Sequence, residues 1–432
     1  MWDSDNEDHA SNGDNHEGSR PLDTLRLTSA YDGSMACHYF DEEGAPVKRQ
    51  SIFVRMADGL KDVFLPIGYP HSVTEDYKPY QIYDSLQAFS STIAGLLSSR
   101  AVLQGFGVGN SESSPTAAVL LTVLQESTGR LATILFAHRC GPAIKVECKY
   151  YRFLADIVND AALFLDIFAP ALPTYPKIMA ICGAGILRAL CGVSGGAAKA
   201  ELSAHFAKNG NLAELNAKDG SQETVISLFG MLVGSLFLQL VHSQEAVLAW
   251  MIVLVSIHLS TNYQAVRSVQ LNTLNNSRFS IVLDNVMATG DVEDATCSEI
   301  LTPSQVSEKE CILTSQKDLS YHVNVQFATR LPRQGEISLR DLQKYNDRAY
   351  VIIRCKGAAT IWMKKEHQHW QVNQAFVEAY SGEYWDASNP SWDGLQNNGW
   401  DTFTNMLEIG SPVRIVVTNE NEENEKAYDD EE

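Results

Sequence analysis

The amino-acid sequence predicts a mainly α-helical protein: a multi-helix membrane bundle of about six apolar helices, followed by a small C-terminal α+β domain. Three observations support this fold class. Two long runs of sequence lack charged side chains, the predicted loops alternate in their content of Lys and Arg, and after about residue 287 the sequence becomes polar and rich in β-forming residues.

The two uncharged runs cover residues 224–244 and 246–266, and each is 21 residues long. A helix of that length reaches about 31 Å and crosses a hydrocarbon core of about 30 Å. Glu245 alone separates the two runs, so we expect a tight helical hairpin. Gly230 and Gly234 form a GxxxG motif in the first of these helices, which permits close helix packing.

Four further segments complete the predicted bundle, although each contains charged residues. The segments are 84–103, 116–138, 153–175 and 177–194. Hydropathy alone is also compatible with buried helices of a soluble bundle. A second interpretation therefore keeps only the last hairpin in the bilayer and leaves the rest as a peripheral bundle.

The loops between these segments favour six spans. With a cytosolic N-terminus, the cytosolic loops are 139–152 and 195–223, and they contain seven Lys or Arg residues. Arg267 and Arg278 follow the last helix on the same side. The opposite loops, 104–115, 172–177 and 243–246, contain only Lys177. This alternation is what the positive-inside rule predicts for short loops.

The formal net charge of −20 is concentrated at the chain ends. Residues 1–19 carry −6 and residues 420–432 carry −7, which leaves −7 for the sequence between them. We therefore expect a disordered acidic N-terminus over 1–45 and a disordered acidic tail over 419–432. The acidic balance argues against nucleic acid as a partner, because phosphates are bound by Lys and Arg.

Between the bundle, assigned to residues 50–285, and the tail we expect a linker over 286–304 and the α+β domain over 305–418. Residues 349–355 and 358–364 predict a β-hairpin joined at Lys356 and Gly357, with a helix near 370–379 after it. Residues 323–328 are a candidate third strand. The aromatic segment 384–400 is expected to pack at the surface.

The eight cysteines show no CxxC spacing and no close pairing with histidine. This pattern favours reduced thiols in a cytosol-facing protein over a disulfide framework or a metal site. The N-terminus resembles neither a signal peptide nor a transit peptide. We therefore expect an endomembrane such as the endoplasmic reticulum rather than a plastid, with both termini cytosolic.

One set of candidate functional residues lies on the predicted helix that follows residue 152. Arg152, Asp156 and Asp160 are spaced i, i+4, i+8 on one face, with Asn159 beside them. Carboxylates at membrane depth usually face a bundle interior and find a partner. Two interpretations stay open: a functional ion-pair network with Arg152 or Arg188, and structural pairing at a helix end.

A second set lies in the polar tract 195–224, between two apolar segments. It comprises Lys199, His205, Lys218 and Asp219. We expect this tract to form a cytosolic re-entrant or interfacial helix that docks against the bundle. The sequence contains no GxSxG, HExxH or P-loop motif, so no catalytic or metal-binding residue is assigned. His205 as a base and Lys199 or Lys218 as Schiff-base formers are the enzymatic alternative.

Six collinear segments within residues 50–285 resemble the RUS (root UVB-sensitive) family. They are FLPIGYPHSVTEDYKPYQIYDSLQAF (64–89), GFGVG (105–109), KYYRFLADIVNDAALFLDIFAP (149–170), GVSGGAAKAELSAHFA (192–207), AKDGSQET (217–224) and NYQAVRSVQLNTLN (262–275). The sequence departs from the family pattern at Glu126, Ser127 and Ala198.

The resemblance implies a membrane or membrane-associated protein. It links the chain to vitamin B6 homeostasis, to seedling growth under UV-B and to auxin transport, and it implies action in pairs. We therefore expect a non-enzymatic component of small-molecule homeostasis or transport, without a bound cofactor, that partners the lipid membrane and another RUS-family protein or a second copy. A membrane-anchored adaptor that recruits proteins through its C-terminal domain is the alternative. An enzyme that handles pyridoxal phosphate (PLP) is a third possibility.

Overall fold

The computed structural model describes residues 24–28, 35–39, 61, 63–105, 115–208, 210–241, 243–289, 300–313, 323–333 and 335–416. The chain divides into two units, Met1–Ser72 and Val73–Glu432. In the first unit, β1 (Thr24–Thr28) pairs antiparallel with β2 (Met35–Tyr39). The segments 1–45 and 419–432, expected to be disordered, lie outside the described residues apart from these two strands, and their disorder stays a prediction.

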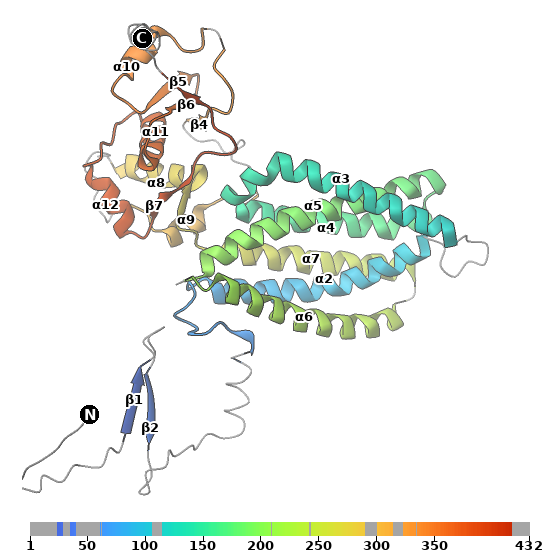
Figure 1. The fold of residues 1–432 in the computed structure, drawn as a ribbon. Helices are drawn as coiled ribbons and strands as arrows, with labels where there is room; N and C mark the ends of the chain where they lie inside the picture. The colour runs from blue at the N-terminus through green and yellow to red at the C-terminus, as the bar shows by residue number, and fades with distance from the viewer. Residues whose placement is uncertain are drawn as a thin grey trace, which may run out of the picture. The chain divides into compact units, whose positions relative to one another are not determined.

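Six long helices form a bundle within the second unit, and Figure 1 shows them side by side. They are α2 (Tyr77–Gly105), α3 (Pro115–Val146), α4 (Cys148–Phe168), α5 (Thr174–Phe206), α6 (Leu212–Leu240) and α7 (Gln244–Ser268). Each overlaps one of the predicted segments, but α4 ends at Phe168, before the predicted 175, and α6 ends at Leu240, before the predicted 244. Several are longer than expected, because the helices continue through charged residues at their ends.

Four of these helices, α3, α5, α6 and α7, are long and apolar enough to cross a membrane. The prediction of about six apolar helices is thus confirmed only in part. The other two helices, α2 and α4, contain acidic residues, such as Asp84 and Asp156. Those side chains are buried in the bundle.

The outer surface of the bundle is apolar. Leu120 of α3 is 63% exposed and Leu232 of α6 is 61% exposed, and similar side chains continue along both helices. Within the apolar window of α6, only 11% of the residues are buried. A large exposed apolar area of this kind usually marks contact with a membrane or another protein.

The glycine pair in α6 packs against α2. A Cβ atom built on Gly230 lies 2.9 Å from the Cβ atom of Thr92, and one built on Gly234 lies 2.6 Å from Leu96 Cδ1. The close packing expected from the GxxxG motif is confirmed. α6 ends at Leu240 and α7 begins at Gln244, as expected for a hairpin, but the helix that the glycines approach is α2.

The C-terminal module contains a four-stranded sheet with β6 (Ala358–Lys364) at its centre. β6 pairs antiparallel with β5 (Tyr350–Cys355) and parallel with β4 (Asn324–Phe327) and β8 (Arg414–Ile415). Helix α11 (His369–Ser381) follows the hairpin. Lys356 and Gly357, the predicted turn, both have positive φ, at 34° and 82°. The predicted hairpin, third strand and helix are confirmed.

Further elements complete the module. They are β3 (Thr273–Asn275), α8 (Asn276–Thr289), α9 (Pro303–Lys309), α10 (Leu339–Lys344), α12 (Pro390–Asn397) and β7 (Asp401–Met406). β3 pairs in parallel with β7, and Phe279 of α8 stacks on Phe376 of α11 at 5.1 Å between ring centroids. The module therefore begins at Thr273 rather than at residue 305, and the expected linker starts inside α8.

The aromatic segment 384–400 differs from its prediction. Trp385 and Trp400 are buried in the core of the module, and Trp392 meets Trp385 edge-to-face at 5.2 Å. Residues 390–397 form α12, whose N-cap Asn389 accepts a hydrogen bond from the backbone of Ser391. Surface packing was therefore the wrong expectation, because these tryptophans fill the core instead.

Candidate functional site

Charged side chains meet in the interior of the bundle between α2 and α4. The Arg152 guanidinium lies 2.8 Å from Asp84 Oδ1 and 3.1 Å from Asp156 Oδ1, and it donates to Gln87 Oε1 at 2.9 Å. All four side chains are buried. The spacing of Arg152 and Asp156 in the sequence indicated their pairing, but the two partners from α2 were missed.

The same cluster continues to α7 through His258. His258 Nδ1 lies 2.8 Å from Asp160 Oδ2, and its Nε2 lies 3.5 Å from Asp156 Oδ2 and 3.2 Å from Gln87 Nε2. Asn262, one turn further along α7, donates to Asp156. We call Asp84, Gln87, Arg152, Asp156, Asp160, His258 and Asn262 the interior cluster.

The signal for the α7 members was present in the sequence. His258 and Asn262 are spaced i, i+4 within the uncharged run 246–266, so they share one helix face. A histidine on an otherwise apolar helix is also common as a simple core residue. Only the tertiary structure shows that this face meets the carboxylates of α4.

A second polar group lies further along the bundle, where Arg188 of α5 pairs with Asp166 of α4. Ser98 of α2 also donates to Asp166, at 2.8 Å. Next to this pair is a cavity of about 490 Å³ between α2, α4 and α5, and Arg188 and Asn159 line it. Two of the candidate residues therefore face a polar cavity rather than the interior cluster.

The polar tract 195–224 is not a separate re-entrant or interfacial helix. Its residues form the last turns of α5, a short connection, and the first turns of α6. Lys199 of α5 bridges Asp219 and Glu223 of α6, each at 2.8 Å, and Gln81 of α2 also donates to Asp219. Lys218 is half-buried next to Asp219 in the sequence. The tract thus joins α5 to α6.

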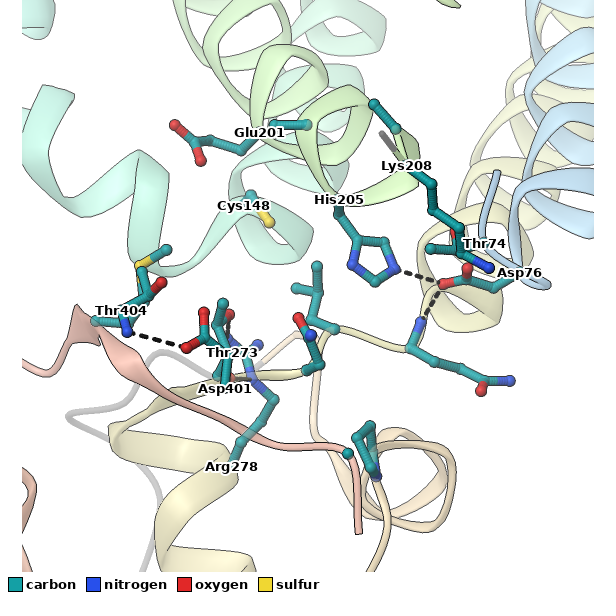
Figure 2. A pocket seen from close by; sticks show the side chains of 18 of the residues that line it. Thr74, Asp76, Cys148, Glu201, His205, Lys208, Thr273, Arg278, Asp401 and Thr404 are labelled. Atoms are coloured by element: carbon teal, nitrogen blue, oxygen red, sulfur yellow. Dashed lines mark hydrogen bonds and ion pairs between the residues drawn. The ribbon is translucent and has the colours of Figure 1, made fainter. Parts of the chain in front are cut away.

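A pocket of about 900 Å³ opens where this end of the bundle meets the C-terminal module. Figure 2 shows His205 of α5 and Asp76, just before α2, facing each other across one side, with Arg278 and Asp401 of the module on another. Lys145, Glu201 and Lys208 also line it, and they form no ion pair with any described residue. The pocket therefore presents both charge signs to a polar solute.

The pocket brings together helix ends that the sequence placed on one side of the membrane. Lys145 ends α3, Lys208 follows α5, and Gln270 follows α7. These positions belong to the loops 139–152 and 195–223 and to the segment after residue 266. The structure thus places the predicted cytosolic loops at one end of the bundle.

His205 and Asp76 form the best-defined contact of the pocket. His205 Nε2 lies 2.9 Å from Asp76 Oδ2, which also accepts the backbone N–H of Gln270 at 2.6 Å. Burial alone would raise the pKa of Asp76, but the hydrogen bond and charge of His205 outweigh it and hold the pKa below its ordinary value. Asp76 is therefore an ionised carboxylate near neutral pH.

A buried ion triplet joins the bundle to the module beside this pocket. Glu310 Oε2 lies 2.7 Å from Lys149 Nζ of α4, and its Oε1 lies 3.0 Å from Arg278 Nη1 of α8. Burial would raise the pKa of Glu310, but the two cations outweigh it and lower the pKa. The neighbouring Cys148 is not a thiolate, because burial raises its pKa to about 11.

The described residues include no group of three or more His, Cys, Asp or Glu side chains that could hold a metal ion. The arrangement can instead bind a polar solute at the end of the bundle and hold buried charge within it. These features define a class: a helical bundle with an apolar exterior, a charged interior and an α+β module that closes one end.

Comparisons with known proteins name the family. A family model described as the vitamin B6 photo-protection and homoeostasis domain matches residues 51–290. RUS family member 1 from Dictyostelium discoideum is 38% identical over 269 residues, covering 62% of this chain and 50% of that protein. The chain belongs to the RUS family. No solved structure matches it.

Two Arabidopsis thaliana relatives extend the comparison. Protein root UVB sensitive 3 is 32% identical over 333 residues, covering 73% of both chains. Protein root UVB sensitive 2, chloroplastic, is 28% identical over 239 residues, covering 55% of this chain and 54% of that protein. The match to root UVB sensitive 3 covers more residues than 1–290 contain, so it includes part of the C-terminal module. The chain spans about half the length of the Dictyostelium relative.

Proposed function

We propose that this chain is a multi-pass membrane protein that acts as a non-enzymatic component of small-molecule homeostasis or transport, linked to vitamin B6. One observation carries the proposal: leucines are exposed along α3 and α6, whereas Arg152 and its carboxylate partners are buried inside the bundle. A soluble bundle has the opposite distribution, because water favours charged groups at the surface. Intramembrane ionisable residues commonly mark a solute or ion path.

The positions of the polar groups support a path along the bundle. The pocket opens at one end, the interior cluster follows, and the cavity beside Arg188 lies further along α2. Along α2 they run from Asp76, just before the helix, through Asp84 to Ser98, in steps of about two and then about four turns. A solute that enters the pocket would meet polar side chains at each level.

Reconstitution tests this proposal directly. The purified chain, placed in liposomes, is expected to accelerate the movement of pyridoxine or another B6 vitamer, and Asp156→Asn is expected to abolish most of that rate. Glu366→Gln is the matched control, because Glu366 is an exposed carboxylate of the C-terminal module, away from the bundle. Equal rates in protein-containing and empty liposomes for every vitamer would refute the transport function.

The environment of the candidate lysine supports a non-enzymatic role. Lys199 is held between two carboxylates, which stabilise its charged ammonium form and disfavour the neutral amine that a Schiff base requires. We therefore propose that PLP is not a covalent cofactor here. An aldimine absorbance band that appears on adding PLP and disappears in Lys199→Arg would contradict this.

For orientation, we propose that the pocket end faces the cytosol, in an endomembrane rather than a plastid. The grouping of Lys145, Lys208 and Arg278 at that end supports it. Single cysteines at residues 140 and 177, in a chain otherwise free of cysteine, are expected to react with a membrane-impermeant reagent from opposite sides. Labelling from the same side would refute this topology.

The adaptor function is the second candidate, and exposed apolar side chains on the module favour it. Leu331, Leu339 and Phe403 are largely exposed. Deleting residues 300–432 would not separate the two functions, because it also removes Glu310 and the core partners of α8. Phe403→Asp is the sharper test: an adaptor loses partner recruitment and keeps its fold, whereas a carrier keeps its transport rate. Partners proposed for either function are another RUS-family protein or a second copy of this chain.

A further inference from the structure

We infer that the interior cluster is a proton-binding site, and that the proton it holds is coupled to movement of the solute. Coupling of the proton to solute movement rests on the proposed transport function and extends it. Binding of the proton follows from the composition and geometry of the cluster itself.

The charge of the cluster favours proton binding. Three carboxylates, Asp84, Asp156 and Asp160, face a single arginine, Arg152. With all of them ionised and His258 neutral, the cluster carries −2, and with His258 protonated it carries −1. Uncompensated charge in a buried site is strongly unfavourable, so such a group takes up protons instead.

No neighbouring cation removes this excess within the described bundle. Lys199 and Arg188 on α5 pair with carboxylates of their own, Lys199 with Asp219 and Glu223 and Arg188 with Asp166. The remaining titratable groups that face the cluster are the Tyr80 hydroxyl of α2 and the Cys191 thiol of α5. Neither of them supplies positive charge.

The hydrogen bonds of the cluster do not remove this excess charge. Gln87 and Asn262 both donate their amide groups to Asp156. Among the described residues, one buried acceptor of the cluster, Asn262 Oδ1, and one buried donor, Arg152 Nε, have no hydrogen-bond partner. The unpaired donors and acceptors therefore balance, and the negative charge of the cluster is what favours an added proton.

The geometry assigns this proton to the pair of Asp160 and His258. Arg152 forms ion pairs with Asp84 and Asp156. Asp160 instead faces His258 Nδ1, at 2.8 Å, and pairs with a positive charge when His258 is protonated. The pair holds the proton either as imidazolium beside carboxylate or as neutral imidazole beside a carboxylic acid. The two forms contain the same number of protons, so the pair binds and releases this proton in a single titration step that belongs to both residues.

Binding of the proton by Asp160 and His258 also changes hydrogen bonds between the helices of the bundle. Without the added proton, His258 Nδ1 donates to the Asp160 carboxylate, and its Nε2 accepts from Gln87 Nε2 at 3.2 Å. With the added proton, in either form of the pair, Nε2 carries a hydrogen, and Asp156 Oδ2, at 3.5 Å, is the acceptor it faces. Because Gln87 and Asp156 both contact Arg152, proton binding at α7 changes the contacts between α2 and α4.

Spectroscopy on the full chain in lipid nanodiscs tests proton binding without any solute. At about pH 8, where an isolated histidine and an isolated carboxyl are both deprotonated, we expect either a protonated His258 by ¹⁵N NMR or the infrared carbonyl band of a protonated buried carboxyl. His258→Gln assigns the first signal and Asp160→Asn the second, while Glu366→Gln, at an exposed position of the module, is expected to change neither. Native protein with neutral histidine and no such carbonyl band would overturn the inference, whether or not the variants fold.

A second measurement tests the coupling. In liposomes, an imposed pH gradient is expected to increase the initial rate of pyridoxine movement several-fold for the native chain and not for Asp160→Asn. Movement that ignores the gradient in the native chain would overturn the coupling. If pyridoxine moves under no condition, the transport function fails, while the spectra still decide whether the cluster binds a proton.

Discussion

The bundle and the C-terminal module distribute their polar and apolar side chains in opposite ways. The module buries aromatic rings, including Trp362, Trp385 and Phe376, and places its Arg330–Glu336 ion pair at the surface. The bundle exposes leucines along α3 and α6 and buries Arg152 with its carboxylates. The module therefore has an apolar interior and a charged surface, whereas the bundle has a charged interior and exposed apolar side chains.

This difference fits the proposed membrane location, in which the two regions meet two different solvents. The module has the side-chain distribution of a domain whose folding is driven by removal of apolar area from water. An apolar exterior removes that driving force from the bundle, so packing and interior polar contacts must hold its helices together. Glu310 lies at the boundary between the two regions and forms an ion pair with one cation of each. These are Lys149 of the bundle and Arg278 of the module.

Removing that shared carboxylate is expected to have the largest effect. Glu310→Gln leaves Lys149 and Arg278 buried without their counter-charge, and breaking a buried ion pair in this way destabilises by about 3–5 kcal/mol. Thermal unfolding in detergent, followed by tryptophan fluorescence, should show the module unfolding at a lower temperature. Glu366→Gln, which removes an exposed carboxylate of the module, is the control and should leave the transition unchanged. Equal transitions for both variants would show that the triplet does not join the regions.

The next largest difference is expected when an acidic residue is placed on the exposed surface of the bundle or of the module. Leu232→Asp puts a carboxylate on the exposed face of α6, where an acid near the centre of a membrane helix costs about 2.5–3.5 kcal/mol. Leu331→Asp makes the same change at an exposed position of the module, where surface substitutions change stability by less than about 0.5 kcal/mol. The fraction of chain that resists alkaline extraction from membranes is the measurement. A water-exposed bundle would tolerate both changes equally.

Acid is expected to weaken the junction selectively. The pKa of Glu310 is lowered in the folded protein, so its stabilising contribution is complete above its ordinary pKa of about 4.3 and is lost as the pH falls through the lower, folded value. The unfolding transition of the module should therefore shift to lower temperature below about pH 4. Because Glu310→Gln has no carboxylate to protonate, its transition should change less over the same range. Parallel acid profiles for the native chain and this variant would contradict the assignment.

Much of the fold follows from local sequence, but less of the site does. The uncharged runs predicted α6 and α7, and runs of β-forming residues on either side of Lys356 and Gly357 predicted β5 and β6. The start of the module at Thr273 was not predictable, because it depends on the pairing of β3 with β7, over a hundred residues away. For the same reason Asp156 was recognised as a candidate, while its contacts with Gln87 and His258 required the packing of three helices.

The smallest expected effects concern two glycines on one helix, and they test how the bundle is held together. Gly230→Ala places a Cβ atom 2.9 Å from Thr92 Cβ, so α6 and α2 must separate, and overpacking of this kind costs about 1–3 kcal/mol. Gly220→Ala, ten residues earlier on α6, meets nothing within 4 Å and should stabilise the helix by up to about 1 kcal/mol, because alanine is the better helix former. Opposite shifts of the thermal transition would show that close α2–α6 contact, rather than helix propensity, determines stability here. If both variants shift the transition upward, α6 does not depend on that contact.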